Sequence, residues 1–208
     1  MKNNILIFII ALAAIQAQAQ TGLEQYYYVQ NKKAVEFVPM VHFETKNNWY
    51  AEARYNYECN NTFSLYAGKE FTGEHKKFTY SLTPLLGSVM GEFSGASTGL
   101  NVAMQLKDIF FTSQSQYTFS YNDPTKDFVF SWSELGYEVS SWIYLGLSMQ
   151  HTQMMHSNTM QFEHGAVIGF TFGRWTVPIY SFSTFDSSRY FVLGINLGIG
   201  SNKKSSNI

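Results

Sequence analysis

Apolar and polar residues alternate strictly along most of the chain. The clearest stretch runs from Arg189 to Gly200, where every second residue is apolar and the residues between them are mostly small or polar. The apolar set is Phe191, Leu193, Ile195, Leu197 and Ile199, and the other set includes Gly194, Asn196, Gly198 and Gly200. Successive side chains of a strand leave on opposite sides of the sheet, so a period of two predicts β-strands. The face that carries the small and polar residues is unlike the packed core of a soluble protein.

The same alternation recurs along the chain and predicts twelve strands. We expect them near residues 24–30, 33–44, 48–58, 62–71, 76–86, 94–106, 108–121, 127–139, 142–152, 159–171, 173–185 and 188–199. The first is the weakest, because Gln25 to Val29 alternates poorly. Without it eleven strands remain, an odd number that bacterial single-chain barrels avoid. We therefore predict about twelve strands, with ten as the alternative.

The N-terminus carries the pattern of an export signal. Met1 and Lys2 form a short positive start, an apolar run spans residues 5–15, and Ala17-Gln18-Ala19 is a small-residue cleavage site. We therefore expect a signal peptide over residues 1–19, a barrel domain over 20–200 and a polar tail over 201–208. After Gln20 no apolar run approaches the 18 or so residues that a membrane-spanning helix needs.

Together these patterns predict an all-β protein, a closed antiparallel up-and-down transmembrane β-barrel. Composition agrees: charged residues make up 14% of the chain, against about 25% in soluble domains. Low charge is what alternation produces when one face of each strand meets lipid and the other a polar interior. The net charge is −1 and no basic stripe is present, which argues against nucleic-acid binding.

The predicted connections have a polarity. With both termini in the periplasm, short turns fall near 45–47, 72–75, 107, 140–141 and 172, and the other end receives 31–32, 59–61, 87–93, 122–126, 153–158 and 186–187. Short periplasmic turns and longer outer loops are typical of outer-membrane barrels. Turn-forming residues occur at Asn47-Asn48, Asn60-Asn61, Asn122-Asp123-Pro124 and Thr72-Gly73.

Two strands break the alternation. The apolar set of Phe128, Phe130 and Trp132 continues one residue out of step from Leu135 onward, which predicts a bulge near Ser133-Glu134. Around Pro178 a bulge or an unpaired position is expected, because proline cannot donate to a ladder.

The polar set of the early strands supplies the candidate functional residues. Those we expect to face the lumen are Glu36, His42, Glu44, Glu52, Arg54, Asn56, Glu58 and Glu70. An acidic wall of this kind favours cations, or else pairs with Arg174, Arg189 and Lys107 across the barrel. A third interpretation is a cross-strand charge network that fills a narrow interior, since twelve strands lie between packed eight-stranded and open sixteen-stranded barrels.

Other chemistry finds little support. Cys59 is the single cysteine, so no intrachain disulfide forms and a cysteine-based metal site is not expected. His151, His156 and His164 do not have the spacing of a standard metal-ligand set. No Gly-x-Ser-x-Gly elbow is present. We predict no cofactor, no metal and no catalytic residues.

One hairpin carries a resemblance. The run from Trp49 to Glu58, followed by Asn61 to Lys69, resembles a hairpin of the small porin-like outer-membrane β-barrel proteins of Gram-negative bacteria, a group here without an assigned activity. The resemblance covers residues 24–199. It implies a place in the cell outer membrane among its lipids, with the barrel-assembly machinery and periplasmic chaperones as partners during biogenesis.

Three functions remain open. The first is an outer-membrane barrel that is a narrow porin-like channel or a structural scaffold, with a polar, acid-rich interior. The second is an exported soluble β-barrel that binds a lipid or a small apolar ligand. The third is an outer-membrane lipid hydrolase or acyltransferase, which needs a serine within hydrogen-bond reach of a histidine. The first requires the face of Leu193, Ile195 and Leu197 to lie outside the barrel.

Overall fold

The computed structural model describes residues 19–31, 33–156, 160–186 and 188–200. The predicted signal peptide, except Ala19, and the predicted tail lie outside these residues. The strands are β1 (Ala19–Gln30), β2 (Glu36–Thr45), β3 (Trp49–Tyr55), β4 (Thr62–Lys69), β5 (Phe71–His75), β6 (Phe78–Gly91), β7 (Gly95–Leu106), β8 (Ile109–Ser120), β9 (Phe128–Ser140), β10 (Ile143–Met154), β11 (Met160–Phe172), β12 (Trp175–Phe182) and β13 (Tyr190–Ile199). A short 3-10 helix, η1 (Pro124–Lys126), lies between β8 and β9. In the described part of the chain no helix is long and apolar enough to cross a membrane.

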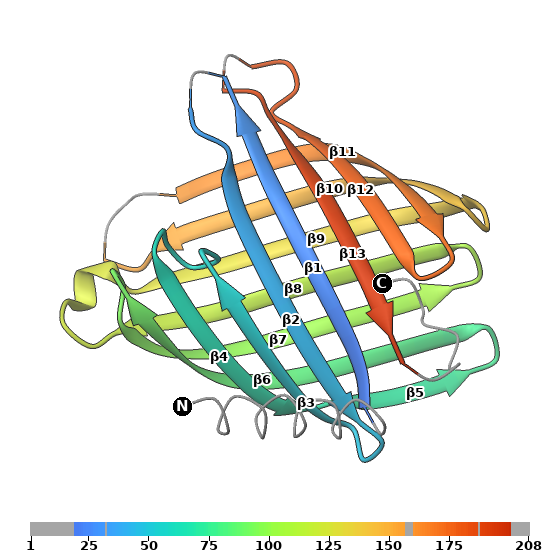
Figure 1. Ribbon diagram of the computed structural model, residues 1–208, viewed down its shortest axis with the longest axis horizontal. Helices are drawn as coiled ribbons and strands as arrows, with labels where there is room; N and C mark the ends of the chain where they lie inside the picture. Colours follow the sequence, from blue (N-terminus) through green and yellow to red (C-terminus); the bar gives the residue numbers. More distant parts are fainter. Residues whose placement is uncertain (1–18, 32, 157–159, 187, 201–208) are drawn as a thin grey trace, which may run out of the picture.

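The strands form one closed antiparallel barrel. β1 pairs with both β2 and β13, and β4 pairs with both β3 and β6, so the sheet closes on itself. β4 and β5 are separated only by Glu70 and both pair with β6, so the barrel has twelve strands and β5 is an extra one. In Figure 1 the wall with β1, β2 and β13 crosses in front of the wall with β7 to β10. The predicted fold is confirmed, and the weakest predicted strand is β1, which closes the barrel.

The apolar set faces outward. In β13 the side chain of Val192 is 0% exposed and that of Leu193 is 37% exposed, although the two are neighbours. Leu65, Leu135 and Leu147 also lie on the outside, with about half or more of each side chain exposed. Leu193 therefore does not lie in a central core. Its burial there would have contradicted a membrane barrel.

The two ends of the barrel differ. At one end, here the turn end, short connections join β2 to β3, β5 to β6, β7 to β8, β9 to β10 and β11 to β12. β1 begins and β13 ends at this turn end. The connections at the other end, the loop end, are on the whole longer. In outer-membrane barrels the shorter turns lie in the periplasm and the longer loops lie outside.

Turn chemistry explains several reversals. Asn48 and Asn61 have φ angles of 61° and 53°, in the left-handed region that asparagine tolerates. Asp123 is the N-cap of η1, and its carboxylate accepts hydrogen bonds from the backbone N–H and the hydroxyl of Thr125. These bonds stabilise the ionised form and lower the pKa of Asp123.

The turn predicted at 72–75 is wrong. Those residues belong to β5, and the chain reverses at Lys76, whose φ is 59°. The Glu70 N–H donates to the carbonyl of Asn48 at the β2–β3 turn, so β5 continues past β3 as a ribbon paired only with β6. Likewise the loop predicted over 87–93 is too long, because β6 runs on to Gly91.

The bulge predicted at Ser133-Glu134 is also wrong. β9 pairs with β8 and β10 without interruption there, and Trp132 and Glu134 are both buried while Leu135 is exposed. The alternation changes phase because the aromatic residues before this point face inward, whereas the apolar residues from Leu135 onward face outward. The register shift in this hairpin lies instead at Ile143/Tyr144.

At Pro178 the expected irregularity is present. The ladder between β12 and β13 is interrupted between Thr176 and Ile179 and then resumes in the same register. Pro178 itself is paired in the ladder with β11, opposite Gly169.

Several inward glycines lie directly opposite large rings. Phe110 faces Gly136 and Tyr144 faces Gly169 in their ladders, and a Cβ added at either glycine would overlap the facing ring. The missing side chain lets each ring lie flat on the neighbouring strand instead of reaching across the lumen.

Replacing Gly136 with alanine is therefore expected to destabilise the barrel by about 1–3 kcal/mol, because the buried Phe110 ring has to move. The free energy of unfolding, measured by urea titration in lipid vesicles, tests this. Gly198→Ala is the matched control: its new Cβ would come no nearer than 4.0 Å to any atom outside its chain neighbours, so its effect should stay within about 0.5 kcal/mol. Equal effects of the two substitutions would contradict the packing argument.

Candidate functional site: the barrel interior

Arg54 is the centre of a buried polar cluster on β3. Its side chain is 2% exposed, and its Nε donates to the carboxylate of Glu52, which is also buried. One terminal nitrogen donates to Gln116 on β8 at 2.6 Å. Because β4, β6 and β7 lie between β3 and β8 in the wall, this bond crosses the interior.

Two tyrosine rings and a second carboxylate complete the Arg54 cluster. The guanidinium carbon lies 4.2 Å from the ring centroid of Tyr57 and 4.4 Å from that of Tyr66. Glu58 lies 3.7 Å from Arg54 and accepts hydrogen bonds from the hydroxyls of Tyr66 and Ser64 at 2.8 and 2.9 Å. Arg54 is thus held by charge, hydrogen bonds and cation–π contacts together.

An aromatic cluster crosses the rest of the interior. The ring of Trp132 on β9 lies 5.2 Å from those of Tyr26 on β1 and Tyr180 on β12. Four strands, β10 to β13, separate β9 from β1 in the wall, so the Tyr26–Trp132 contact also spans the lumen. The indole N–H of Trp132 donates to Ser148 at 2.8 Å, and the Tyr180 hydroxyl donates to Glu134 at 3.0 Å.

The residues predicted to face the lumen are distributed along the barrel rather than gathered in one place. Glu52, Arg54 and Glu58 meet in the Arg54 cluster. Glu36 and Asn56 line a cavity near the loop end, described below. The other three lie apart from both groups.

Those three residues are found toward the turn end. The ring of His42 stacks on that of Tyr50, and its Nδ1 lies 3.6 Å from a Glu24 carboxylate oxygen, beyond hydrogen-bond distance. Glu44 is partly buried near the end of β2. Glu70, between β4 and β5, accepts a hydrogen bond from Ser81 at 2.5 Å.

The basic residues suggested as partners do not enter the interior. Lys107, Arg174 and Arg189 are exposed in connections between strands. Arg54 forms ion pairs with Glu52 and Glu58, and His42 lies in a longer contact with Glu24.

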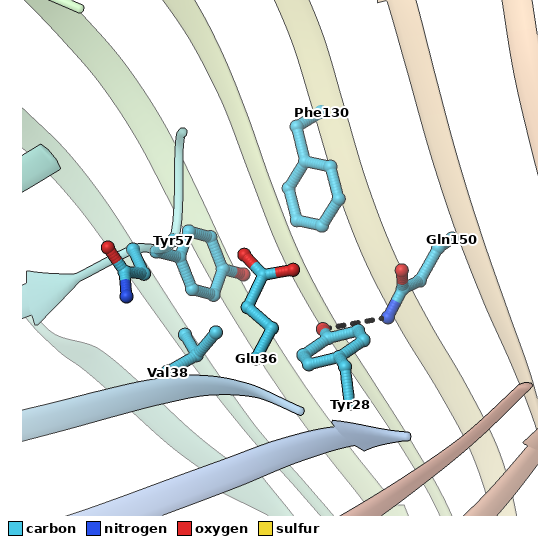
Figure 2. A pocket seen from close by; sticks show the side chains of 7 residues that line it. Tyr28, Glu36, Val38, Tyr57, Phe130 and Gln150 are labelled. Carbon is cyan, nitrogen blue, oxygen red and sulfur yellow. Dashed lines mark hydrogen bonds between the residues drawn. The ribbon is translucent and has the colours of Figure 1, made fainter. Parts of the chain in front are cut away.

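A cavity of about 170 Å³ opens inside the barrel near the loop end. Its lining comes from five parts of the wall and consists of Tyr28, Glu36, Val38, Asn56, Tyr57, Phe130 and Gln150. Figure 2 shows the carboxylate of Glu36 pointing into the space between the rings of Tyr28, Tyr57 and Phe130. Gln150 donates to the Tyr28 hydroxyl at 3.3 Å. The amide of Asn56 donates to the carbonyl of Phe37 and holds the segment after β3 in place.

Several interior residues escaped the sequence analysis. They are buried or line the cavity, and they are Tyr26, Tyr28, Tyr57, Tyr66, Gln116, Phe130, Trp132, Glu134 and Gln150. The sequence signal was the phase break in β9, which marks where aromatic residues move to the inner face.

Four serines lie on the outer face of β8 and β9. Ser113, Ser115, Ser131 and Ser133 alternate with inward residues and hydrogen-bond to one another at 2.9–3.5 Å. Among the described residues no histidine is hydrogen-bonded to a serine, so the pair that the enzyme alternative requires is not formed there. Nor does the described part of the chain bring three possible metal ligands together.

The fold has close counterparts among solved structures. A KdgM porin superposes with a TM-score of 0.60 at 8% identity, over 85% of this chain and 98% of the porin. A KdgM porin in complex with disordered oligogalacturonate gives 0.63 at 9% identity, with the same coverage. A NanC porin gives 0.57 at 10% identity, over 86% of this chain and 100% of the porin. The chain therefore has the porin fold, while no protein-family model and no curated protein matches it.

Proposed function

We propose that this barrel lies in the cell outer membrane and acts as a narrow porin-like channel whose acid-rich interior favours small cations. The observation that carries the proposal is the imbalance of charge inside. Glu24, Glu52 and Glu58 are held by hydrogen bonds from tyrosine hydroxyls, and Arg54 is the base that accompanies them. Carboxylates lining a low-dielectric passage raise the local concentration of cations.

The crossing contacts support a narrow passage rather than a wide one. The Arg54 cluster and the aromatic cluster both link opposite walls, so large solutes have no straight path. A polar interior inside an apolar outer band is the arrangement of membrane barrels. The outward position of residues such as Leu147 speaks against the soluble ligand-binding alternative, because that face would meet water.

The solute class is expected to differ from that of one structural neighbour. A KdgM porin is known in complex with oligogalacturonate, a chain of sugar acids. Such a polyanion is repelled by an interior rich in carboxylates. We expect this barrel to exclude anionic oligosaccharides.

The test is conductance in planar bilayers. Purified protein whose folding is checked by heat-modifiable migration should give small current steps, and under a KCl gradient the reversal potential should indicate preference for K⁺. Glu58→Gln should reduce that preference, since it removes an interior charge. Asp108→Asn, at an exposed turn, should leave it unchanged.

Preference for chloride would overturn the proposed selectivity. A folded barrel that stays electrically silent would favour the scaffold reading over the channel.

A further inference from the structure

The carboxylate of Glu36 lines the cavity near the loop end. Among the described residues, the side chain of Glu36 forms no hydrogen bond and no ion pair and the residue is exposed, whereas the buried side chains of Glu52 and Glu58 are paired. Lys33, in the preceding connection, lies too far from Glu36 to form an ion pair with it. The carboxylate points into the cavity and not toward the wall (Figure 2).

The walls beside this carboxylate are aromatic. Tyr57 and Phe130 meet edge to face with their centroids 5.5 Å apart, and Tyr28 lies across from them. The Tyr57 ring already binds a cation, because the Arg54 guanidinium lies against it. Aromatic faces attract cations through their quadrupole, and several of them around one space form the usual site for an ammonium group.

The remaining lining limits the ligand. The amide of Gln150 is engaged with Tyr28, and Tyr57 donates its hydroxyl to Gln114 at 2.9 Å. The cavity lining supplies no basic side chain, so an anion would meet Glu36 with nothing to balance it. A volume of about 170 Å³ is comparable to an engineered cavity of about 150 Å³ that binds benzene.

We propose that this cavity is a binding site for a small organic cation with an ammonium head group, held by the Glu36 carboxylate and the rings of Tyr28 and Phe130. This inference rests on the proposed function and deepens it, since the site lies near the loop end of the same interior and would receive organic cations first. The carboxylate neutralises the charge, and the rings replace the water lost by the alkyl groups.

The test compares choline with its uncharged isostere 3,3-dimethylbutan-1-ol, by isothermal titration calorimetry with the folded full-length barrel in detergent. Binding is then scored whether or not the barrel conducts. Choline should bind, and the isostere should bind at least about tenfold more weakly. Glu36→Gln should weaken choline binding by about tenfold or more. Phe130→Leu, which keeps an apolar side chain but removes the ring, should weaken it severalfold. Asp186→Asn, an exposed acid at the same end, should have no effect.

Equal binding of choline and the isostere, or an unchanged affinity in Glu36→Gln, would overturn the proposed site. No choline binding by a barrel that still prefers K⁺ would overturn this inference and leave the proposed channel standing. Choline binding by a barrel without cation preference would support the site and reject the proposed selectivity. Heat-modifiable migration of each variant confirms that a lost affinity is not a lost fold.

Discussion

Replacing Arg54 with methionine is expected to destabilise the barrel by about 3–5 kcal/mol, because the carboxylates of Glu52 and Glu58 then stay in the interior without a counter-charge. Arg54 is 2% exposed, and it links β3 to Gln116 on β8. The substitution keeps the apolar length of the side chain, so lost packing contributes little. Urea titration of the barrel in lipid vesicles, followed by heat-modifiable migration, measures the change.

A double-mutant cycle separates charge from packing. Arg54→Met combined with Glu52→Gln should recover part of the loss, since one uncompensated carboxylate is removed. Arg54→Lys keeps the charge but loses the planar fork that contacts Glu52 and Gln116 together, so its cost should be intermediate. If Arg54→Met lowers the free energy of unfolding less than Gly198→Ala does, the Arg54 cluster does not hold the two walls together.

Replacing Trp132 with alanine is expected to widen the passage and raise the single-channel conductance severalfold. The indole lies between Tyr26 and Tyr180, and its N–H donates to Ser148. Its removal opens the contact between opposite walls. The same change should lower the free energy of unfolding by about 3 kcal/mol, the lower end for a buried tryptophan, since water can enter the space.

Trp142→Ala is the control for this experiment. Trp142 lies at the β9–β10 turn with 52% of its side chain exposed, so its loss should alter neither the conductance nor the passage. Unchanged current steps in Trp132→Ala would mean that ions bypass the aromatic cluster.

Alternation alone located the strands well, because successive side chains of a strand point to opposite faces of the sheet. Even the doubtful first strand is present, and its poor pattern has a physical reason. Tyr26 and Tyr28 point inward while Tyr27 points outward, so aromatic residues occupy both faces of β1. A scale that separates apolar from polar residues cannot distinguish an inner tyrosine from an outer one.

Residues that fit more than one position explain the wrong predictions at Ser133-Glu134 and at residues 72–75. The phase break after Phe128, Phe130 and Trp132 predicts a bulge near Ser133-Glu134, but β9 pairs without interruption there because these aromatic side chains point inward. Thr72-Gly73 has the composition of a turn, yet Gly73 is a strand residue opposite Tyr80, whose ring covers it. Glycine marks both turns and close ring contacts, and the sequence does not tell them apart.

The acidic residues of the candidate site could be identified from the sequence, but their contacts across the barrel could not. Acids on alternate positions of the early strands are visible in the sequence, and Glu52 and Arg54 are neighbours on one strand. Their partner Gln116 lies on β8, and the tryptophan that faces Tyr26 lies on β9. Contacts across a lumen depend on the flattening and stagger of the barrel, which local patterns do not specify.

The direction of the two faces is most directly tested by spin labels along β13. After Cys59, which is exposed, is replaced by serine, single nitroxides are placed at successive residues from Phe191 to Asn196 in lipid vesicles. Labels on the outer face, at Phe191, Leu193 and Ile195, should collide with oxygen more often than with a water-soluble nickel complex. Labels on the inner face, at Val192, Gly194 and Asn196, should not show this excess of oxygen collisions. A lack of alternation, or the opposite phase, would contradict a barrel with lipid outside and a polar interior.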